Sequence, residues 1–190
     1  MNRGQLYTVP NLITGVRFVL AALLAFLLAL EQTTGIAFTA CLVFTVAAVS
    51  DFVDGYYARK YEVVTVVGKL MDPLADKVLV ATALIMLIPL GELPAWIALV
   101  ILCREMLVTG LRSMASASGV VVAASGLGKY KSVMQYIGLG VMIFPANLLP
   151  IPKLHTLGLL IMYVALGLTV WSGLDYFYKL RNIVLDAPAD

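Results

Sequence analysis

The sequence has few charged residues and only two cysteines. Of its 190 residues 13% are charged and 62% are hydrophobic, whereas soluble domains hold about 25% charged residues. This composition excludes an ordinary water-soluble protein. Cys41 and Cys103 stand in separate apolar segments, so they form neither a CxxC motif nor a disulfide framework. The thiols are therefore expected to be plain buried side chains.

Long apolar runs fill most of the chain and predict six membrane-spanning helices. A spanning helix needs about 20 residues, so six helices with short connections nearly use up the chain. The runs cover residues 11–30, 35–58, 72–90, 94–117, 132–149 and 154–178. The expected fold is an all-α integral membrane protein with one domain over residues 11–181. A juxtamembrane segment, 1–10, precedes this domain, and a short tail, 182–190, follows it.

The basic residues fall on one side of this six-span arrangement. Of the 13 Lys and Arg residues, only Lys153 falls on the opposite side. The positive-inside rule therefore predicts a multi-pass protein of the cell membrane, with both termini and a polar active-site cavity on the cytoplasmic side. The outer loops hold Glu31, Glu92, Lys153 and the single histidine, His155. Catalysis through a Ser/His or Cys/His pair is accordingly not expected.

Four aspartates interrupt the apolar pattern. Asp51 and Asp54 close the second run, and Asp72 and Asp76 open the third. A carboxylate near the bilayer centre costs roughly 2.5 to 3.5 kcal/mol, so four of them require compensation. Pairing with nearby Arg and Lys side chains is one explanation. The other is a hard divalent cation, magnesium or manganese, because the ligand set offers only oxygen and such ions bridge to phosphate oxygens.

Three residues beside the first aspartate pair fit a ligand that carries phosphate. Gly55 removes a side chain where a ligand approaches the backbone, and Ala58 keeps the same helix face shallow. Arg59 reaches a phosphate from that face. On a helix these residues lie with Asp51 and Asp54 within an arc of about 140°. The end of the second run therefore predicts a face that is acidic and also binds phosphate.

Residues 51–76 resemble the signature of the CDP-alcohol phosphatidyltransferase family. They read DFVDGYYARKYEVVTVVGKLMDPLAD and match DxxDGxxAR, eight residues, then GxxxDxxxD. The fixed positions are all present: Asp51, Asp54, Gly55, Ala58, Arg59, Gly68, Asp72 and Asp76. The resemblance implies an enzyme, a homodimer, that transfers a phosphatidyl group from CDP-diacylglycerol to an alcohol within membrane lipid. A nucleic-acid partner is not expected.

The resemblance also implies roles for single residues. The metal would be held by Asp51, Asp54, Asp72 and Asp76, and Asp76 would also be the general base. The CDP-lipid would contact Gly55, Ala58, Arg59, Thr65 and Gly68, and three similar positions in the first span, Asn11, Thr14 and Arg17. A helix cap and an interfacial arginine explain these last three residues equally well.

A second region bears on the alcohol acceptor. The stretches REMLVTGLR, 104–112, and GLGKYKSVMQ, 126–135, look like the phosphatidylglycerolphosphate synthases of that family. They predict a basic pocket formed by Arg104, Thr109, Arg112, Lys129 and Lys131. An acceptor that already carries a phosphate needs such a pocket, because the nearby carboxylates repel a dianion. The leading acceptor is glycerol 3-phosphate, although the positive-inside rule alone also places basic residues here.

Several alternatives remain open at this point. Within the family, inositol phosphate, serine or phosphatidylglycerol would each replace glycerol 3-phosphate as the acceptor. An intramembrane prenyltransferase also uses aspartates and magnesium, but it lacks the DGxxAR element and is usually longer. A cation transporter carries acids along its whole path, whereas the outer halves of these spans hold none.

Overall fold

The described part of the chain is built from α-helices. The computed structural model describes residues 9–61, 66–117, 126–149, 151 and 153–185, and no β-strand occurs among them. The helices are α1 (Val9–Ala29), α2 (Thr34–Tyr61), α3 (Val66–Leu87), α4 (Ala95–Ala117), α5 (Gly126–Ile143) and α6 (Leu154–Leu185). A short 3-10 helix, η2 (Ala146–Leu148), follows α5. The expected all-α class is confirmed for these residues.

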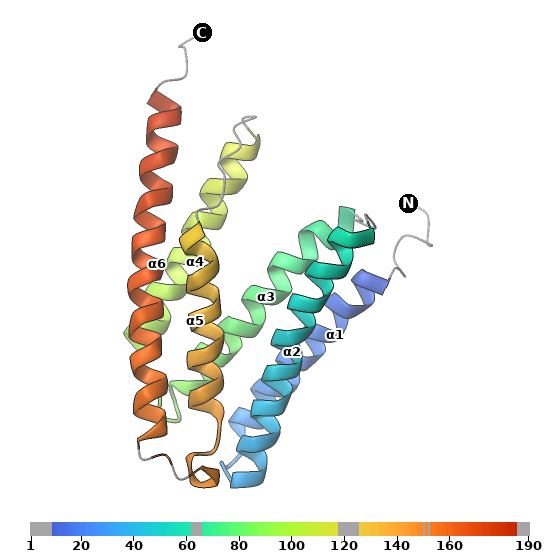
Figure 1. Cartoon of the computed structure of the whole chain (residues 1–190), viewed down its shortest axis with the longest axis vertical. Coiled ribbons are helices and arrows are strands. Elements are labelled where there is room, and N and C mark those ends of the chain that lie inside the picture. Colours follow the sequence, from blue (N-terminus) through green and yellow to red (C-terminus); the bar gives the residue numbers. More distant parts are fainter. Residues whose placement is uncertain (1–8, 62–65, 118–125, 150, 152, 186–190) are drawn as a thin grey trace.

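The helices form two groups of three that meet at one end and diverge at the other (Figure 1). In the first group α1 packs against both α2 and α3, and in the second α6 packs against both α4 and α5. We call the end that holds the connections 30–33 and 88–94 and the 3-10 helix η2 the closed end, and the opposite end the open end. Because successive helices alternate in direction, α1 begins and α6 ends at the open end (Figure 1).

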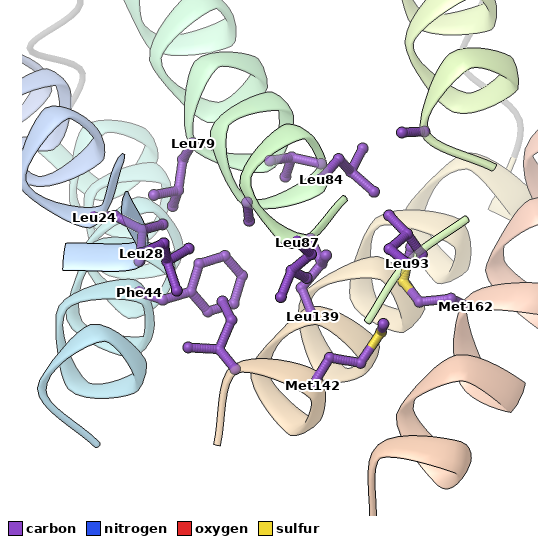
Figure 2. Packing of buried hydrophobic residues seen from close by; sticks show 14 of the residues in the cluster. Leu24, Leu28, Phe44, Leu79, Leu84, Leu87, Leu93, Leu139, Met142 and Met162 are labelled. Atoms are coloured by element: carbon purple, nitrogen blue, oxygen red, sulfur yellow. The ribbon is translucent and has the colours of Figure 1, made fainter. Parts of the chain in front are cut away.

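A hydrophobic core fills the closed half of the bundle. Figure 2 shows side chains from both helix groups packed together there. The core includes Leu24 and Leu28 of α1, Phe44 of α2, Leu79, Leu84 and Leu87 of α3, Ile97 of α4, Leu139 and Met142 of α5, and Met162 of α6. The buried polar residues lie toward the open half instead: Arg17, Lys131, Gln135, Thr169 and Ser172. The bundle thus has a closed half with an apolar core and an open half that holds buried polar residues.

Two glycines bring α5 and α6 into close contact. A Cβ atom built on Gly158 would lie 2.5 Å from Cγ of Met142 and 3.3 Å from the carbonyl oxygen of Gly138. A Cβ on Gly138 would lie 2.8 Å from Sδ of Met162. Small residues let helix backbones approach in this way, which is a common form of helix packing in membranes.

Replacing Gly158 with leucine is expected to destabilise the protein, because the new side chain has no room between α5 and α6. Overpacking of this kind costs about 1 to 3 kcal/mol, so the Tm in detergent micelles should fall by several degrees. Gly167→Leu is the matched control on the same helix, since nothing lies within 4 Å of a Cβ there. An equal fall in Tm for both variants would contradict this account.

Three predicted spans have wrong limits, and one of them is the sixth, predicted over 154–178, because α6 continues to Leu185. The fifth is predicted over 132–149, but α5 covers Gly126–Ile143 and Pro145 precedes η2. Proline lacks a backbone N–H and disfavours helix at the residue before it, which explains the early end. The third is predicted from residue 72, but α3 begins at Val66, so Asp72 lies inside the helix. Polar residues at that end of α3 hide its start from an argument based on apolar runs.

The expected membrane topology is borne out only in part. Among the described residues, Leu154–Arg181 of α6 is one helical segment long and apolar enough to cross a membrane. Shorter apolar helical segments cover Gly15–Ala29, Thr34–Ser50 and Lys77–Leu87. Large apolar side chains also project outward, and Val19, Phe26, Leu107 and Trp171 are each at least 60% exposed. Helices that are apolar on both their inner and outer faces are typical of a membrane bundle.

Candidate active site

The structure places the signature motif on two consecutive helices at the open end. Asp51 and Asp54 lie in the second half of α2, and Asp72 and Asp76 lie in the first half of α3. Residues 62–65, which include Thr65, connect the two helices and lie outside the described residues. The helices also carry the other motif positions: Gly55, Ala58 and Arg59 in α2, and Gly68 in α3.

The side chains of the motif lie outside the described part of the structure, so the joint metal site stays a prediction. The same holds for Asn11 and Thr14, whose backbone lies at the start of α1, and for Lys129 at the start of α5. Arg17 is described, and its side chain is buried at 1% exposure. A buried arginine differs from the interfacial one that snorkelling would predict.

A cavity of about 550 Å³ lies between α3, α4 and α5. Its polar lining residues are Lys77, Glu105, Thr109, Lys131, Ser132 and Gln135, and apolar residues such as Leu74, Ile101 and Tyr136 form the rest. Lys77 directly follows Asp76 in α3, so the cavity adjoins the signature motif along the chain. The largely apolar wall lowers the local dielectric constant and strengthens every charge interaction inside the cavity.

Charged groups from α4 and α5 meet at the wall of this cavity. Lys131 is only 4% exposed, and its Nζ forms an ion pair with Oε1 of Glu105. Nη1 of Arg104 lies 3.0 Å from the same oxygen. Hydrogen bonds to ionised groups are stronger than neutral ones, particularly away from water. Glu105 therefore joins two cations that come from different helices.

A second polar contact links α3 to α4 at the cavity. Nζ of Lys77 donates a hydrogen bond to Oγ1 of Thr109. The Thr109 hydroxyl in turn donates to the backbone carbonyl of Glu105, at 2.6 Å. Lys77 and Lys131 thus line the same cavity from opposite helices, and both present an ammonium group.

Arg104 points toward α6 rather than into the cavity. Its Nε donates to the carbonyl oxygen of Thr169 at 3.1 Å, and its Nη2 donates to Oγ of Ser172 at 2.8 Å. Arg112 also faces α6, where its guanidinium carbon lies 5.7 Å from the ring centroid of Tyr176. Both contacts join α4 to α6.

The predicted basic pocket is therefore divided in the structure. Thr109 and Lys131 line the cavity, whereas Arg104 and Arg112 are held against α6. Sequence reasoning missed Lys77 and Gln135 as cavity residues, and it gave Glu105 no role. The position of Lys77 directly after Asp76 was a usable signal. The sequence carried no signal for the pairing of Glu105, because one of its partners, Lys131, comes from another helix.

The single histidine lies at the closed end. Nδ1 of His155 is 2.6 Å from Oε2 of Glu92, and its Nε2 is 3.2 Å from the carbonyl oxygen of Phe144. These contacts join the start of α6 to the connections before α4 and after α5. His155 is thus part of a structural contact between loops, at the end of the bundle away from the motif.

Comparison with known proteins relates the chain to one family and its solved fold. The family model for CDP-alcohol phosphatidyltransferase matches residues 7–171. The CDP-diacylglycerol--glycerol-3-phosphate 3-phosphatidyltransferase of Bacillus subtilis (strain 168) is 45% identical over 141 residues, 73% of this chain and 71% of the relative. The enzyme of the same name from Haemophilus influenzae is 30% identical over 187 residues, 95% and 97% of the two chains.

A further relative and a solved structure extend the comparison. A probable phosphatidylglycerophosphate synthase of Mycobacterium tuberculosis is 37% identical over 186 residues, 95% of this chain and 86% of the relative. The crystal structure of Mycobacterium tuberculosis phosphatidylinositol phosphate synthase with CDP-DAG bound superposes with a TM-score of 0.67 at 17% identity. The superposition covers 97% of this chain and 94% of that one. At this identity the superposition shows a shared fold.

Proposed function

Because the chain belongs to the CDP-alcohol phosphatidyltransferase family, we propose that it transfers the phosphatidyl group of CDP-diacylglycerol to sn-glycerol 3-phosphate. The products are phosphatidylglycerol phosphate and CMP. Several relatives carry the name of this reaction, at up to 45% identity. All the fixed positions of the family signature are present between Asp51 and Asp76.

The observation that carries the choice of acceptor is the cavity next to the motif, which holds two lysines. Lys77 and the buried Lys131 both line it, and a phosphate group on the acceptor would compensate their charge. Serine has no phosphate group, so it would bring no negative charge of this kind to the two lysines. Inositol phosphate would satisfy the same charges, and the names of the relatives favour glycerol 3-phosphate over it.

In the proposed mechanism the hydroxyl of the acceptor attacks directly. Asp76 accepts the proton of the primary hydroxyl of glycerol 3-phosphate. The hydroxyl oxygen then bonds to the phosphorus that carries diacylglycerol, and the bond from this phosphorus to CMP breaks with its electron pair on CMP. Lys77 and Lys131 hold the acceptor's phosphate in the adjoining cavity while its hydroxyl reaches Asp76.

The donor set of the motif fits magnesium or manganese. Asp51, Asp54, Asp72 and Asp76 supply oxygen only, and their two helices are joined by the short connection 62–65, so both pairs belong to the open end. These four residues would hold the cation. When bound, such a cation neutralises the pyrophosphate and stabilises the departing CMP. Arg59, Gly55 and Thr65 would contact the CDP-lipid beside it.

We also propose the setting of the reaction. The outward apolar side chains of the helices would face lipid in a multi-pass arrangement, with the open end at the cytoplasmic surface, and the chain would act as a homodimer. CDP-diacylglycerol would keep its acyl chains in the bilayer. The water-soluble acceptor would enter from the cytoplasm, where the basic residues gather.

An acceptor comparison tests the proposed function. Purified protein in liposomes that contain CDP-diacylglycerol is given glycerol 3-phosphate, inositol phosphate, serine or phosphatidylglycerol, and CMP release is measured. We expect release with glycerol 3-phosphate and only background with the other three. Equal or faster release with another acceptor would overturn the assignment of glycerol 3-phosphate and leave the family unaffected.

A further inference from the structure

We propose that Glu105 and Arg104 are positioning residues that hold the Lys131 ammonium at the cavity wall, where it binds the phosphate of the acceptor. This inference rests on the proposed function and assigns different tasks to residues that the sequence groups in one pocket. Lys131 touches the acceptor, whereas Glu105 and Arg104 act through Lys131.

Lys131 requires a partner to keep its position. Its ammonium is compact, strongly hydrated in water and attached to a flexible stem of four carbons. At 4% exposure it has lost most of its contact with solvent, and a buried charge without a partner is strongly destabilising. Glu105 supplies an ionised partner from the facing helix α4. The carboxylate therefore fixes where the ammonium lies in the cavity.

Glu105 is itself oriented by Arg104. Nη1 of Arg104 lies 3.0 Å from Oε1 of Glu105, the same oxygen that pairs with Lys131. A guanidinium is planar and always charged, so it directs a carboxylate better than an ammonium does. One oxygen of the Glu105 carboxylate thus contacts two cationic groups, Arg104 and Lys131. These two contacts fix the position of the carboxylate from two sides.

Helix α6 fixes Arg104 in turn. Its Nε and Nη2 donate to Thr169 and Ser172, at 3.1 and 2.8 Å. A Cβ atom on Gly173 would lie 3.2 Å from Cγ of Arg104 and 3.3 Å from its Nε, so the glycine leaves the space in which the arginine lies. With its three guanidinium nitrogens directed to protein groups, Arg104 serves as an anchor rather than as a phosphate ligand.

The charges of this network match the proposed acceptor. Lys77, Lys131 and Arg104 carry three positive charges and Glu105 carries one negative charge, which leaves a balance of two positive charges. A phosphate monoester carries about −1.5 to −2 at neutral pH. Glu105 therefore orients Lys131 and still leaves enough positive charge for the phosphate.

Glu105→Gln separates positioning from simple charge balance. If the carboxylate only reduced the positive charge of the cavity, its removal would strengthen phosphate binding and lower the KM for glycerol 3-phosphate. A positioning role predicts the opposite change, a higher KM for glycerol 3-phosphate. We expect that KM to rise about tenfold, while kcat and the KM for CDP-diacylglycerol change less than about twofold. Asp175→Asn is the matched control, because it removes a carboxylate that pairs with Lys179 on the exposed side of α6.

A second variant tests the anchor without altering any charge. Gly173→Ala places a methyl group against Arg104, whereas Gly167→Ala, on the same helix, meets nothing within 4 Å. We expect Gly173→Ala to raise the KM for glycerol 3-phosphate about threefold and Gly167→Ala to leave it unchanged.

The outcomes distinguish this inference from the proposed function. If the wild-type protein releases CMP with glycerol 3-phosphate, but Glu105→Gln leaves that KM unchanged or lowers it, the positioning role is wrong and the proposed function stands. An unchanged KM for Gly173→Ala, in a folded protein, equally overturns the anchoring role of Arg104. If the wild-type protein releases no CMP with glycerol 3-phosphate, both proposals are wrong.

Discussion

Replacing Asp76 with asparagine is expected to lower kcat for CMP release about 10³-fold, within the range that a positioned general base contributes. Asparagine keeps the shape of the side chain but cannot accept the proton of the acceptor's hydroxyl. Asp76 lies in α3 directly before Lys77, which lines the cavity. The KM for glycerol 3-phosphate should change far less than kcat, because Lys77 and Lys131 remain in place.

The control for this substitution is Asp175→Asn. Asp175 also lies on a helix and forms an ion pair, 2.8 Å from Lys179, but this pair is on the exposed side of α6. Exposed pairs contribute about 0 to 1 kcal/mol, so this variant should fold and keep its rate. If a folded Asp76→Asn protein kept more than a small fraction of the wild-type kcat, Asp76 would not be the base.

Removing divalent cations is expected to reduce CMP release to background. The proposed site consists of carboxylates, so EDTA should strip the cation, and magnesium or manganese should restore the rate. Zinc should restore it poorly, because the site lacks the nitrogen and sulfur ligands that zinc prefers. The measurement is CMP release in liposomes after exhaustive chelation, followed by titration of each cation.

Single substitutions link this dependence to the motif. Asp72→Asn removes one oxygen ligand without changing the size of the side chain, so the magnesium concentration needed for half-maximal rate should rise about 10-fold to 100-fold. Asp175→Asn should leave that concentration unchanged. Full activity of the wild-type protein after chelation would contradict a metal-dependent mechanism.

The sequence predicts most helices well, because each one follows from a run of apolar residues in its own segment. Apolar runs of spanning length indicate α1, α2, α4 and α6 within a few residues, apart from the end of α6, which continues to Leu185. The errors occur where polar residues belong to a helix. The first two turns of α3 hold Gly68, Lys69 and Asp72, and these residues interrupt the apolar run at the start of the helix. The chain around Pro145 stays apolar after α5 has ended, so only the missing N–H marks that end.

The family could be predicted from eight fixed positions, since their spacing is specific, and the family model confirms it. The arrangement of the cavity residues could not be predicted from the sequence. Residue spacing places Arg104, Glu105 and Thr109 on one arc of α4, but it does not say which helix lies opposite each residue. Thr169 and Ser172 turn Arg104 toward α6, while Lys131 of α5 meets Glu105. Those neighbours depend on how α4, α5 and α6 pack against one another.

The most direct test of the central claim is the stoichiometry of transfer. Purified protein in liposomes with CDP-diacylglycerol receives radiolabelled glycerol 3-phosphate, and both the CMP released and the label that enters the lipid phase are counted. Transfer to this acceptor predicts equal amounts of the two, with the label in phosphatidylglycerol phosphate. Release of CMP without label in the lipid phase would show hydrolysis or another acceptor, and would contradict the claim.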